Sequence, residues 1–275
     1  MSEKSKNKEQ AITITPSLAI SFSIDDYATD YTGERDESSS KKEFKKLIEP
    51  LAELQEVMHA TGSHGLLVVL QGMDCSGKTS TTDKVFSEVS HAGLRMANFK
   101  KPTPEEMARD FLWRVHQQIP RRGEIVVFDR SHYEDVLIQR VHEWVSPTVI
   151  KQRYEQIRNF ELLLTQTGIT VLKFFLHISY EYQTSRLQRR LRNLTKHWKF
   201  SANDLEERKY WDQYMEAYEL AIRNTSSDYA PWHVIPADNR WMRDEIVARV
   251  VVEALKKMDL EWPSLPEELR DIKIK

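Results

Sequence analysis

The stretch Leu66-Leu-Val-Val-Leu-Gln-Gly-Met-Asp-Cys-Ser-Gly-Lys-Thr-Ser-Thr-Thr82 decides the fold of this chain. An apolar, branched run ends in Gly72-x-x-x-x-Gly77-Lys78-Thr79, which is the complete P-loop pattern, and a helix-compatible segment follows. Glycines let backbone N–H groups turn around a phosphate, and the first turn of a helix adds partial positive charge. The lysine of this pattern supplies a mobile positive charge to the phosphates, and the threonine hydroxyl suits Mg²⁺. The stretch therefore predicts a phosphate-binding loop between a buried strand and a helix.

The composition excludes several classes of protein. The 275 residues suit one large α/β domain, and 40 basic against 42 acidic side chains give a net charge of −2. This balance argues against a uniformly basic nucleic-acid binder. The single cysteine excludes an intramolecular disulfide and is typical of a reducing compartment, and no apolar run is long enough to span a membrane. We therefore expect a cytoplasmic protein with neither nucleic acid nor a membrane as a partner.

The two ends of the chain differ in composition from its middle. Residues 1–40 are rich in Asp, Glu, Ser and Thr and poor in core-forming side chains, so they are predicted to be a polar, disordered tail. The alternation of Ile20, Phe22 and Ile24 offers an alternative, a short strand docked on the domain. Residues 41–260 are predicted to form the catalytic domain, with a lid at about 183–210, and residues 261–275 a C-terminal tail.

Hydrophobic periodicity predicts an alternation of helices and strands. Lys41 to His59 has the spacing of an amphipathic helix, which Pro50 is expected to kink or divide, and another helix begins at Ser146 and stops at Gly168. The predicted strands are 66–70, 94–99, 125–128, 171–178 and 233–235. This order indicates an α/β fold in which helices cover both faces of a parallel five-stranded sheet. Ligands of such sheets bind at the carboxyl ends of the strands.

Two acidic residues are candidates for the metal side of the site. The strand 125–128 ends in Asp129-Arg130, and an apolar strand that ends in aspartate is typical of the Mg²⁺-side acid of a P-loop enzyme. Asp74 lies inside the P-loop, where it would repel phosphates unless a cation intervenes, so both acids are predicted to share a Mg²⁺ environment. The alternatives are ordinary turn chemistry for Asp129 and a solvent-facing side chain for Asp74. Arg130 is predicted to bind phosphate oxygens bidentately.

A strongly basic segment follows later in the chain. It contains no acidic residue between Glu181 and Asp204, and leucines at helical spacing leave its cations on the other face. The cations are Arg186, Arg189, Arg190, Arg192, Lys196 and Lys199. A solvated helix face is the simpler interpretation, but unbalanced cations repel one another unless an anion joins them, so the segment predicts a phosphate-gripping lid. Lys100 and Lys101 leave a strand at the same sheet edge and are weaker candidates.

Several longer motifs resemble one enzyme family. They are Gly72-Met-Asp-Cys-Ser-Gly-Lys78, Asp110-Phe-Leu-Trp-Arg-Val-His116, Phe128-Asp-Arg-Ser-His-Tyr-Glu-Asp-Val136, Trp198-Lys-Phe-Ser201, Asp212-Gln-Tyr-Met-Glu-Ala-Tyr218 and Ala230-Pro-Trp-His-Val-Ile-Pro-Ala-Asp238. In this order they resemble the polyphosphate kinase 2 family, the polyphosphate:nucleotide phosphotransferases, over roughly residues 42–258. The resemblance implies a fold like the P-loop nucleotide kinases, a helical lid and Mg²⁺-dependent, reversible phosphoryl transfer from polyphosphate to ADP or GDP, with AMP and GMP as further acceptors. It also implies nucleoside triphosphates as products and a homo-oligomer.

The resemblance also implies roles for individual residues. Asp74, Lys78, Asp129 and Arg130 would be catalytic, with Mg²⁺ near the two acids. Lys100, Arg140, Arg186 and Arg190 would line the phosphate channel or lid, and Asp204 would be a further acid near the lid. The P-loop pattern and the basic segment, independently of the resemblance, add Gly72, Gly77, Thr79, Arg189 and Lys199 as candidates for contact with phosphate or nucleotide. Glu134 would bear on the choice between mono- and diphosphate acceptors. Thr79 departs from the family, because many relatives carry Asp or Gly after the loop lysine.

Two other functions remain open at this point. An ATP-dependent small-molecule or nucleotide kinase would use the basic lid to clamp ATP. A nucleotide-binding regulatory module without turnover would keep the loop and lose the chemistry, although the combination of Asp74, Lys78, Asp129 and Arg130 argues for an enzyme.

Overall fold

The P-loop strand lies at the centre of a six-stranded sheet, in a computed structural model that describes residues 12–270 and residue 272. Strand β2 (Gly65–Gln71) pairs in parallel with β4 (Ile125–Asp129) on one side and with β5 (Ile169–His177) on the other. Strand β3 (Leu94–Asn98) extends the parallel sheet beyond β4, and β6 (Trp232–Pro236) extends it beyond β5. The five predicted parallel strands are confirmed, with bounds shifted by one or two residues.

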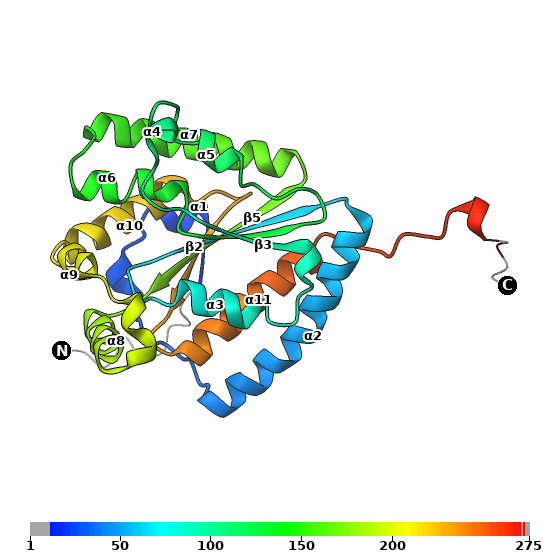
Figure 1. The fold of residues 1–275 in the computed structure, drawn as a ribbon, viewed down its shortest axis with the longest axis horizontal. Coiled ribbons are helices and arrows are strands. Elements are labelled where there is room, and N and C mark those ends of the chain that lie inside the picture. Colours follow the sequence, from blue (N-terminus) through cyan, green and yellow to red (C-terminus); the bar gives the residue numbers. More distant parts are fainter. Residues whose placement is uncertain (1–11, 271, 273–275) are drawn as a thin grey trace.

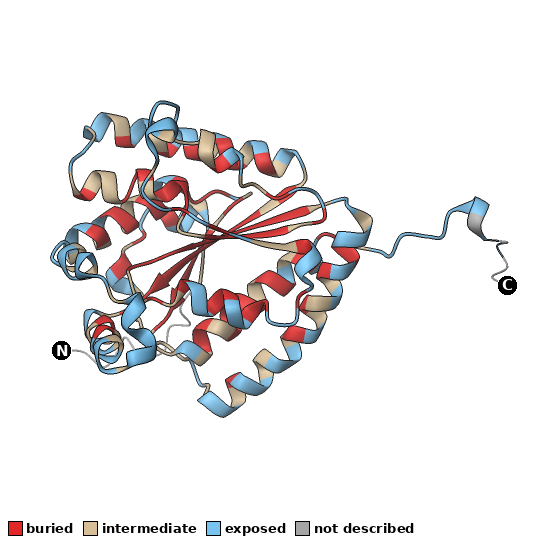
Figure 2. Ribbon diagram, viewed as in Figure 1, coloured by how far each residue is buried: buried red, intermediate tan, exposed pale blue. Residues whose placement is uncertain are grey.

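Helices cover both faces of this sheet (Figure 1). On one face α2 (Glu37–Thr61), α3 (Lys78–Val85) and α11 (Arg240–Lys256) pack together. The other face carries α4 (Pro104–Met107), α5 (Trp113–His116), α6 (Ile138–Val141), α7 (Pro147–Gln166) and α10 (Trp211–Thr225). The central strands are therefore buried on both sides, as Figure 2 shows, and the predicted α/β class is confirmed.

The segment predicted to be a lid is helical. Helix α8 (Tyr180–Arg192) follows β5, a 3₁₀ helix η5 (Leu194–Lys199) follows α8, and α9 (Ala202–Arg208) completes the segment. Figure 1 shows α8 and α9 together at one end of the sheet. The remaining 3₁₀ helices are η2 (Ile24–Asp26), η3 (His91–Gly93), η4 (His132–Asp135) and η6 (Glu267–Leu269).

The prediction of a polar tail over residues 1–40 is wrong for residues 12–40. Strand β1 (Thr13–Ile14) adds to β6 in antiparallel orientation, α1 (Pro16–Ala19) follows it, and the side chains of Ile14 and Phe22 are buried. The guanidinium of Arg223 on α10 donates to the Phe22 carbonyl at 2.6 Å, which anchors the segment to the domain. A few buried apolar side chains are enough to hold this segment on the domain, because without β1 the outer edge of β6 would be unpaired. Residues 1–11 lie outside the described residues.

Two further details differ from the sequence-based expectations. The alternation of Ile20, Phe22 and Ile24 is not a strand, since α1 has just ended and Ile24 begins η2. Helix α2 runs through Pro50 without division, and it starts four residues before the predicted Lys41 because Asp36 forms a capping box with Ser39.

Residues 261–268 are exposed, and Figure 1 shows this end of the chain extending away from the domain. Among the helices of the described residues, none combines the length and the apolar character needed to cross a membrane.

Candidate active site

The P-loop has the backbone that its glycines predict. Gly72 has a φ of +147° and Gly77 a φ of +101°, and Gly77 caps α3 at its N-terminus. A Cβ atom on Gly72 would lie 2.7 Å from the Leu176 carbonyl oxygen, and one on Gly77 would overlap the Arg243 guanidinium. Both positions therefore require glycine. Lys78 is buried, and its Nζ donates to the carbonyl oxygens of Gly72 at 2.8 Å and Met73 at 3.3 Å.

Asp129 reaches the P-loop because the two strands pair in register. Leu70 of β2 lies opposite Asp129 of β4, so the carboxylate emerges beside the start of α3. There the hydroxyl of Thr79 donates to Asp129 Oδ2 at 2.8 Å. A P-loop threonine beside a strand-end aspartate is the arrangement that holds Mg²⁺ in P-loop enzymes. Thr79 thus contributes a hydroxyl directly beside one of the two predicted acids.

Arg130 lies between two carboxylates. Its Nη2 donates to Asp74 Oδ1 at 2.7 Å, and its Nη1 is 3.5 Å from Glu134 Oε2. Burial of Asp74 opposes ionisation, but the charges of Arg130 and Lys78 outweigh it and hold the pKa of Asp74 below its usual range. The carboxylate of Glu134, against the opposing effect of burial, raises the pKa of Arg130 above its ordinary value. Arg130 has a φ of +65°, an uncommon conformation for a non-glycine residue that is found preferentially at functional sites.

A basic cavity of about 450 Å³ opens beside the P-loop. It brings together residues from α3, β4, the lid and α11. Its charged lining consists of Asp74, Lys78, Asp83, Asp129, Arg130, Arg186, Arg189, Arg190, Lys196, Lys199 and Arg240. Eight cations thus face three carboxylates in one cavity, although the chain as a whole has a net charge of −2.

Most of these cations have no acidic partner. Arg190 is paired, since its Nη1 donates to Asp204 Oδ2 at 2.9 Å and to the Lys199 carbonyl at 3.0 Å. Burial of Asp204, together with the nearby charge of Asp74, raises the pKa of Asp204 although Arg190 opposes the shift. Within the part of the chain that the structure describes, no ion pair forms at Arg186, Arg189, Lys196, Lys199 or Arg240. This surplus of positive charge is complementary to a polyanion.

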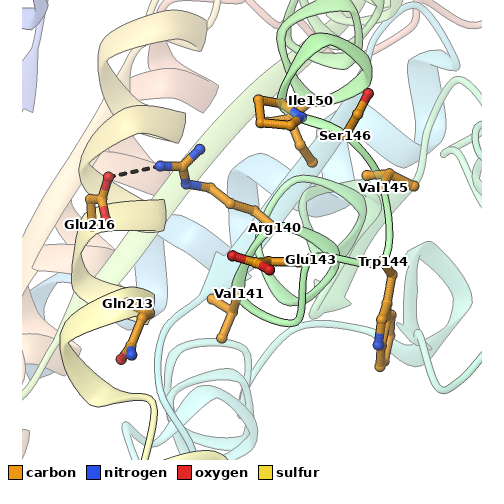
Figure 3. A pocket seen from close by; sticks show the side chains of 10 residues that line it. Arg140, Val141, Glu143, Trp144, Val145, Ser146, Ile150, Gln213 and Glu216 are labelled. Carbon is orange, nitrogen blue, oxygen red and sulfur yellow. Dashed lines mark hydrogen bonds and ion pairs between the residues drawn. The ribbon is translucent and has the colours of Figure 1, made fainter.

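Four residues of the predicted set, Gly72, Lys100, Glu134 and Arg140, lie outside the cavity lining, and Gly72 contributes to the loop through its backbone. Lys100 is exposed after β3, and its carbonyl accepts from Arg114 at 2.8 Å. Glu134 is connected to the site through Arg130. Arg140 on α6 turns to Glu216 of α10 at 2.7 Å, and it lines a separate cavity of about 650 Å³ with Trp144 and Ser146 (Figure 3). In this structure Arg140 is therefore part of an ion pair between two helices and not of the basic cavity.

Arg240 is a cavity residue that the sequence analysis missed. It is the first residue of α11, which follows β6 after a short turn, and β6 pairs in parallel with β5. A cation at the carboxyl end of the last predicted strand was therefore a usable signal. The neighbouring Arg243 contacts the P-loop and the start of α3. Its Nη1 donates to the Ser76 carbonyl at 3.1 Å, and its Nη2 donates to the Ser80 hydroxyl at 3.2 Å.

Comparison with known proteins gives a consistent result. A family model described as polyphosphate kinase 2 matches residues 34–263. The AMP/ADP-polyphosphate phosphotransferase of Meiothermus ruber is 54% identical over 213 residues, which cover 78% of this chain and 80% of the relative. The ADP-polyphosphate phosphotransferase of Rhodopseudomonas palustris is 39% identical over 240 residues, which cover 82% of this chain and 83% of that protein. The crystal structure of polyphosphate kinase 2 from Arthrobacter aurescens TC1 has a TM-score of 0.86 and 38% identity, and the match covers 96% of this chain and 95% of that one.

Proposed function

The chain belongs to the polyphosphate kinase 2 family, and we propose that its basic cavity transfers phosphoryl groups reversibly between inorganic polyphosphate and nucleotides. The observation that carries this proposal is a set of cations without ion-pair partners in the described residues: Arg186, Arg189, Lys196, Lys199 and Arg240. These side chains extend the positive surface from the P-loop across α8 and η5 to α11. A donor made of many linked phosphates uses such a surface along its length, whereas the phosphates of a single ATP end close to the loop.

The chemistry requires positioning and charge neutralisation more than covalent catalysis. The loop amides and Lys78 would bind the phosphoryl group during its transfer, and the guanidinium of Arg130 would bind its oxygens bidentately. To do so, Lys78 exchanges its present carbonyl partners, Gly72 and Met73, for phosphate oxygens. An acceptor phosphate is already anionic, so no general base is needed. His132 is consistent with this, because it is fully buried, and burial lowers its pKa despite its contact with Glu161.

We further propose that Mg²⁺ binds at Asp129 and Asp74, with the hydroxyl of Thr79 beside them. All three supply oxygen atoms, which Mg²⁺ prefers. Within the described residues, no three His, Cys, Asp or Glu side chains are placed to hold a metal ion by themselves. This fits Mg²⁺, which is usually bound through one or two carboxylates together with substrate phosphates. When bound, the ion would neutralise charge on the transferring phosphate.

For the acceptor we propose both nucleoside mono- and diphosphates. The Meiothermus ruber relative, at 54% identity, carries AMP and ADP in its name. Glu134 is our candidate for the residue that affects the choice between mono- and diphosphate acceptors. It contacts Arg130, as Asp74 does, and so affects which phosphate oxygens Arg130 can reach.

The direct test supplies polyphosphate and Mg²⁺ with AMP, ADP, GMP or GDP in separate reactions without ATP, and separates the nucleotides by ion-exchange chromatography. We expect each acceptor to gain phosphoryl groups. Products that form only when ATP is added would indicate an ATP-dependent kinase, and binding without product at saturating Mg²⁺ would indicate a regulatory module. Lys78→Ala should lower turnover at least about 100-fold with folding intact, as expected for lost transition-state charge stabilisation. Lys84→Ala, an exposed lysine on the same helix, is the matched control.

A further inference from the structure

One buried side chain joins the lid to the P-loop. Gln183 lies on α8 and is 1% exposed. Its Nε2 donates to the main-chain carbonyl of Asp74 at 2.8 Å. Its Oε1 accepts from the guanidinium of Arg208, the last residue of α9. A single amide group therefore contacts the catalytic loop on one side and the far end of the lid on the other.

The two partners of Gln183 determine its orientation. A main-chain carbonyl is only an acceptor, and a guanidinium is only a donor. An amide presents one donor and one acceptor, so it satisfies both partners at once. A carboxylate at this position would place an acceptor against the Asp74 carbonyl, and an apolar side chain would leave buried polar groups without partners. Glutamine is thus the side chain that this position requires.

Arg208 clamps α9 to the first turns of α8. Besides Gln183, its guanidinium donates to the Tyr180 carbonyl at 3.1 Å and to the Thr184 hydroxyl, and its Cζ lies 3.4 Å from the centre of the Tyr180 ring. All of these contacts come from α8. The same helix α9 carries Asp204, which holds Arg190 at the cavity. The position of α9 therefore affects both a phosphate-facing arginine and the orientation of Gln183.

On the other side, Gln183 fixes a strained part of the P-loop. Cys75 follows Asp74 with a φ of +72°, a left-handed conformation that is uncommon outside glycine. The Asp74 carbonyl belongs to the peptide group that enters this turn, and the Asp74 carboxylate contacts Arg130 at 2.7 Å. A hydrogen bond to that carbonyl favours the conformation in which the carboxylate faces Arg130.

We propose that Gln183 is a positioning residue that couples the docking of α9 through Arg208 to the orientation of Asp74. The inference rests on the proposed function, in which Asp74 is an essential acid near the metal. When Arg208 is docked, the Gln183 amide is held with its N–H₂ toward the loop. When Arg208 is absent, the buried amide loses the partner that fixes this orientation, and the P-loop turn loses support. The lid thereby acts on the catalytic loop in addition to supplying cations.

Three variants test this coupling through hydrogen exchange and kinetics. Gln183→Met removes both hydrogen bonds at similar volume, Gln183→Glu keeps the contact to Arg208 and reverses the one to Asp74, and Arg208→Ala removes the clamp. We expect all three to raise amide exchange in the P-loop peptide, measured by mass spectrometry on the full chain without substrate. We also expect kcat to fall about 10-fold while the KM for the nucleotide changes less than about 2-fold, because Asp74 acts on the transferring group.

A double variant separates coupling from general destabilisation. If Arg208 acts on the P-loop through Gln183, Arg208→Ala in the Gln183→Met background should add less than about 2-fold to the rise in P-loop amide exchange, which does not report on the contact between Asp204 and Arg190. Gln188→Met is the matched control, because Gln188 is an exposed glutamine on the same helix, and it should leave exchange and kcat unchanged. Unchanged P-loop exchange in Gln183→Met, or multiplicative increases of P-loop exchange in the double variant, would overturn the coupling. A wild-type chain inactive with polyphosphate would instead overturn the proposed function, since the exchange measurement does not depend on activity.

Discussion

Salt should weaken polyphosphate binding steeply, and the structure gives the expected slope. Six cations of the basic cavity have no carboxylate within ion-pair distance in the described residues: Lys78, Arg186, Arg189, Lys196, Lys199 and Arg240. Each is expected to replace a counterion when a polyanion binds. Counterion release makes the logarithm of the affinity fall linearly with the logarithm of salt concentration, by about 0.7 per phosphate contact for single-stranded polyanions.

Six contacts give a slope of about −4, which corresponds to a roughly 300-fold loss of affinity between about 50 and 200 mM salt. Arg130 and Arg190 are left out of this count, because each already has a carboxylate partner that a phosphate must replace. When a phosphate replaces that carboxylate, the freed carboxylate attracts a cation in place of the one that the phosphate loses, so the net release is small. The value of −4 is therefore the part of the slope that unpaired side chains supply.

The assay is fluorescence anisotropy of end-labelled polyphosphate with the full chain, at several NaCl concentrations and without nucleotide. Arg186→Gln and Lys196→Gln should each reduce the slope by about 0.7 and weaken binding most at low salt. Arg121→Gln is the matched control, because Arg121 is exposed and precedes β4 at the opposite edge of the sheet. An affinity that is flat between low and moderate salt, or an equal change in slope for Arg121→Gln and Arg186→Gln, would refute the binding of the polymer along this cavity.

Three further predictions concern stability, and urea unfolding measures all of them. Lys173→Met should lower the free energy of unfolding by about 3–5 kcal/mol, because it leaves the fully buried carboxylate of Glu161 without the ammonium that lies 2.7 Å away, and Lys173→Met with Glu161→Leu should recover most of the loss. Ile14→Ala should lower it by about 2–5 kcal/mol because Ile14 is fully buried, whereas Ile20→Ala should change it little because Ile20 is 84% exposed. Burial lowers the pKa of His233 to about 4, so the stabilisation from its neutral ring is complete above the ordinary value of 6.5 and is lost as the pH falls through 4. The free energy of unfolding decreases by about 3 kcal/mol over this pH range, and in His233→Phe it should decrease correspondingly less.

The parallel sheet and the loop at its centre could be predicted because their signals are local. The strand before Gly72 is a continuous apolar run, and the pattern Gly72 to Thr79 specifies a backbone that few other residues can adopt. Asp129 could be predicted for a related reason, since carboxyl ends of parallel strands share an edge. In the structure Thr79 contacts Asp129 at this edge, and the role of Asp129 at a metal stays a prediction.

The N-terminal segment could not be predicted from its composition. Strand β1 has only two residues, Thr13 and Ile14, and its stability comes from pairing with β6, which lies more than 200 positions later in the chain. Hydrophobic periodicity needs several residues to be detected, so such a strand gives no signal. The buried side chains of this segment look like isolated apolar residues in a polar sequence.

Side-chain partners were the other part that sequence could not supply. Arg140 and Arg190 are both arginines at suitable positions along the chain, yet Arg140 turns to Glu216 on a neighbouring helix and Arg190 to Asp204 within the lid. Which acid an arginine meets depends on helix packing, and the charge count of a segment does not reveal it. Gln183 illustrates the same limit, because a glutamine in a basic helix has no pattern of its own.

The distribution of partners also explains how a nearly neutral chain keeps a strongly basic cavity. Arg208, which holds α9 against α8, is satisfied by carbonyls, a hydroxyl and an aromatic ring of α8 and forms no ion pair within the described residues, whereas Arg140 pairs with Glu216 away from the cavity. Arg190, which lines the cavity, pairs with the lid carboxylate of Asp204. The other lid cations repel one another until a polyanion joins them, so binding must stabilise this segment more than the rest of the domain. The lid is held in place by its own contacts, and most of its cations are unpaired. It is therefore suited to a substrate made of repeated phosphates, because each bound phosphate reduces the repulsion between those cations.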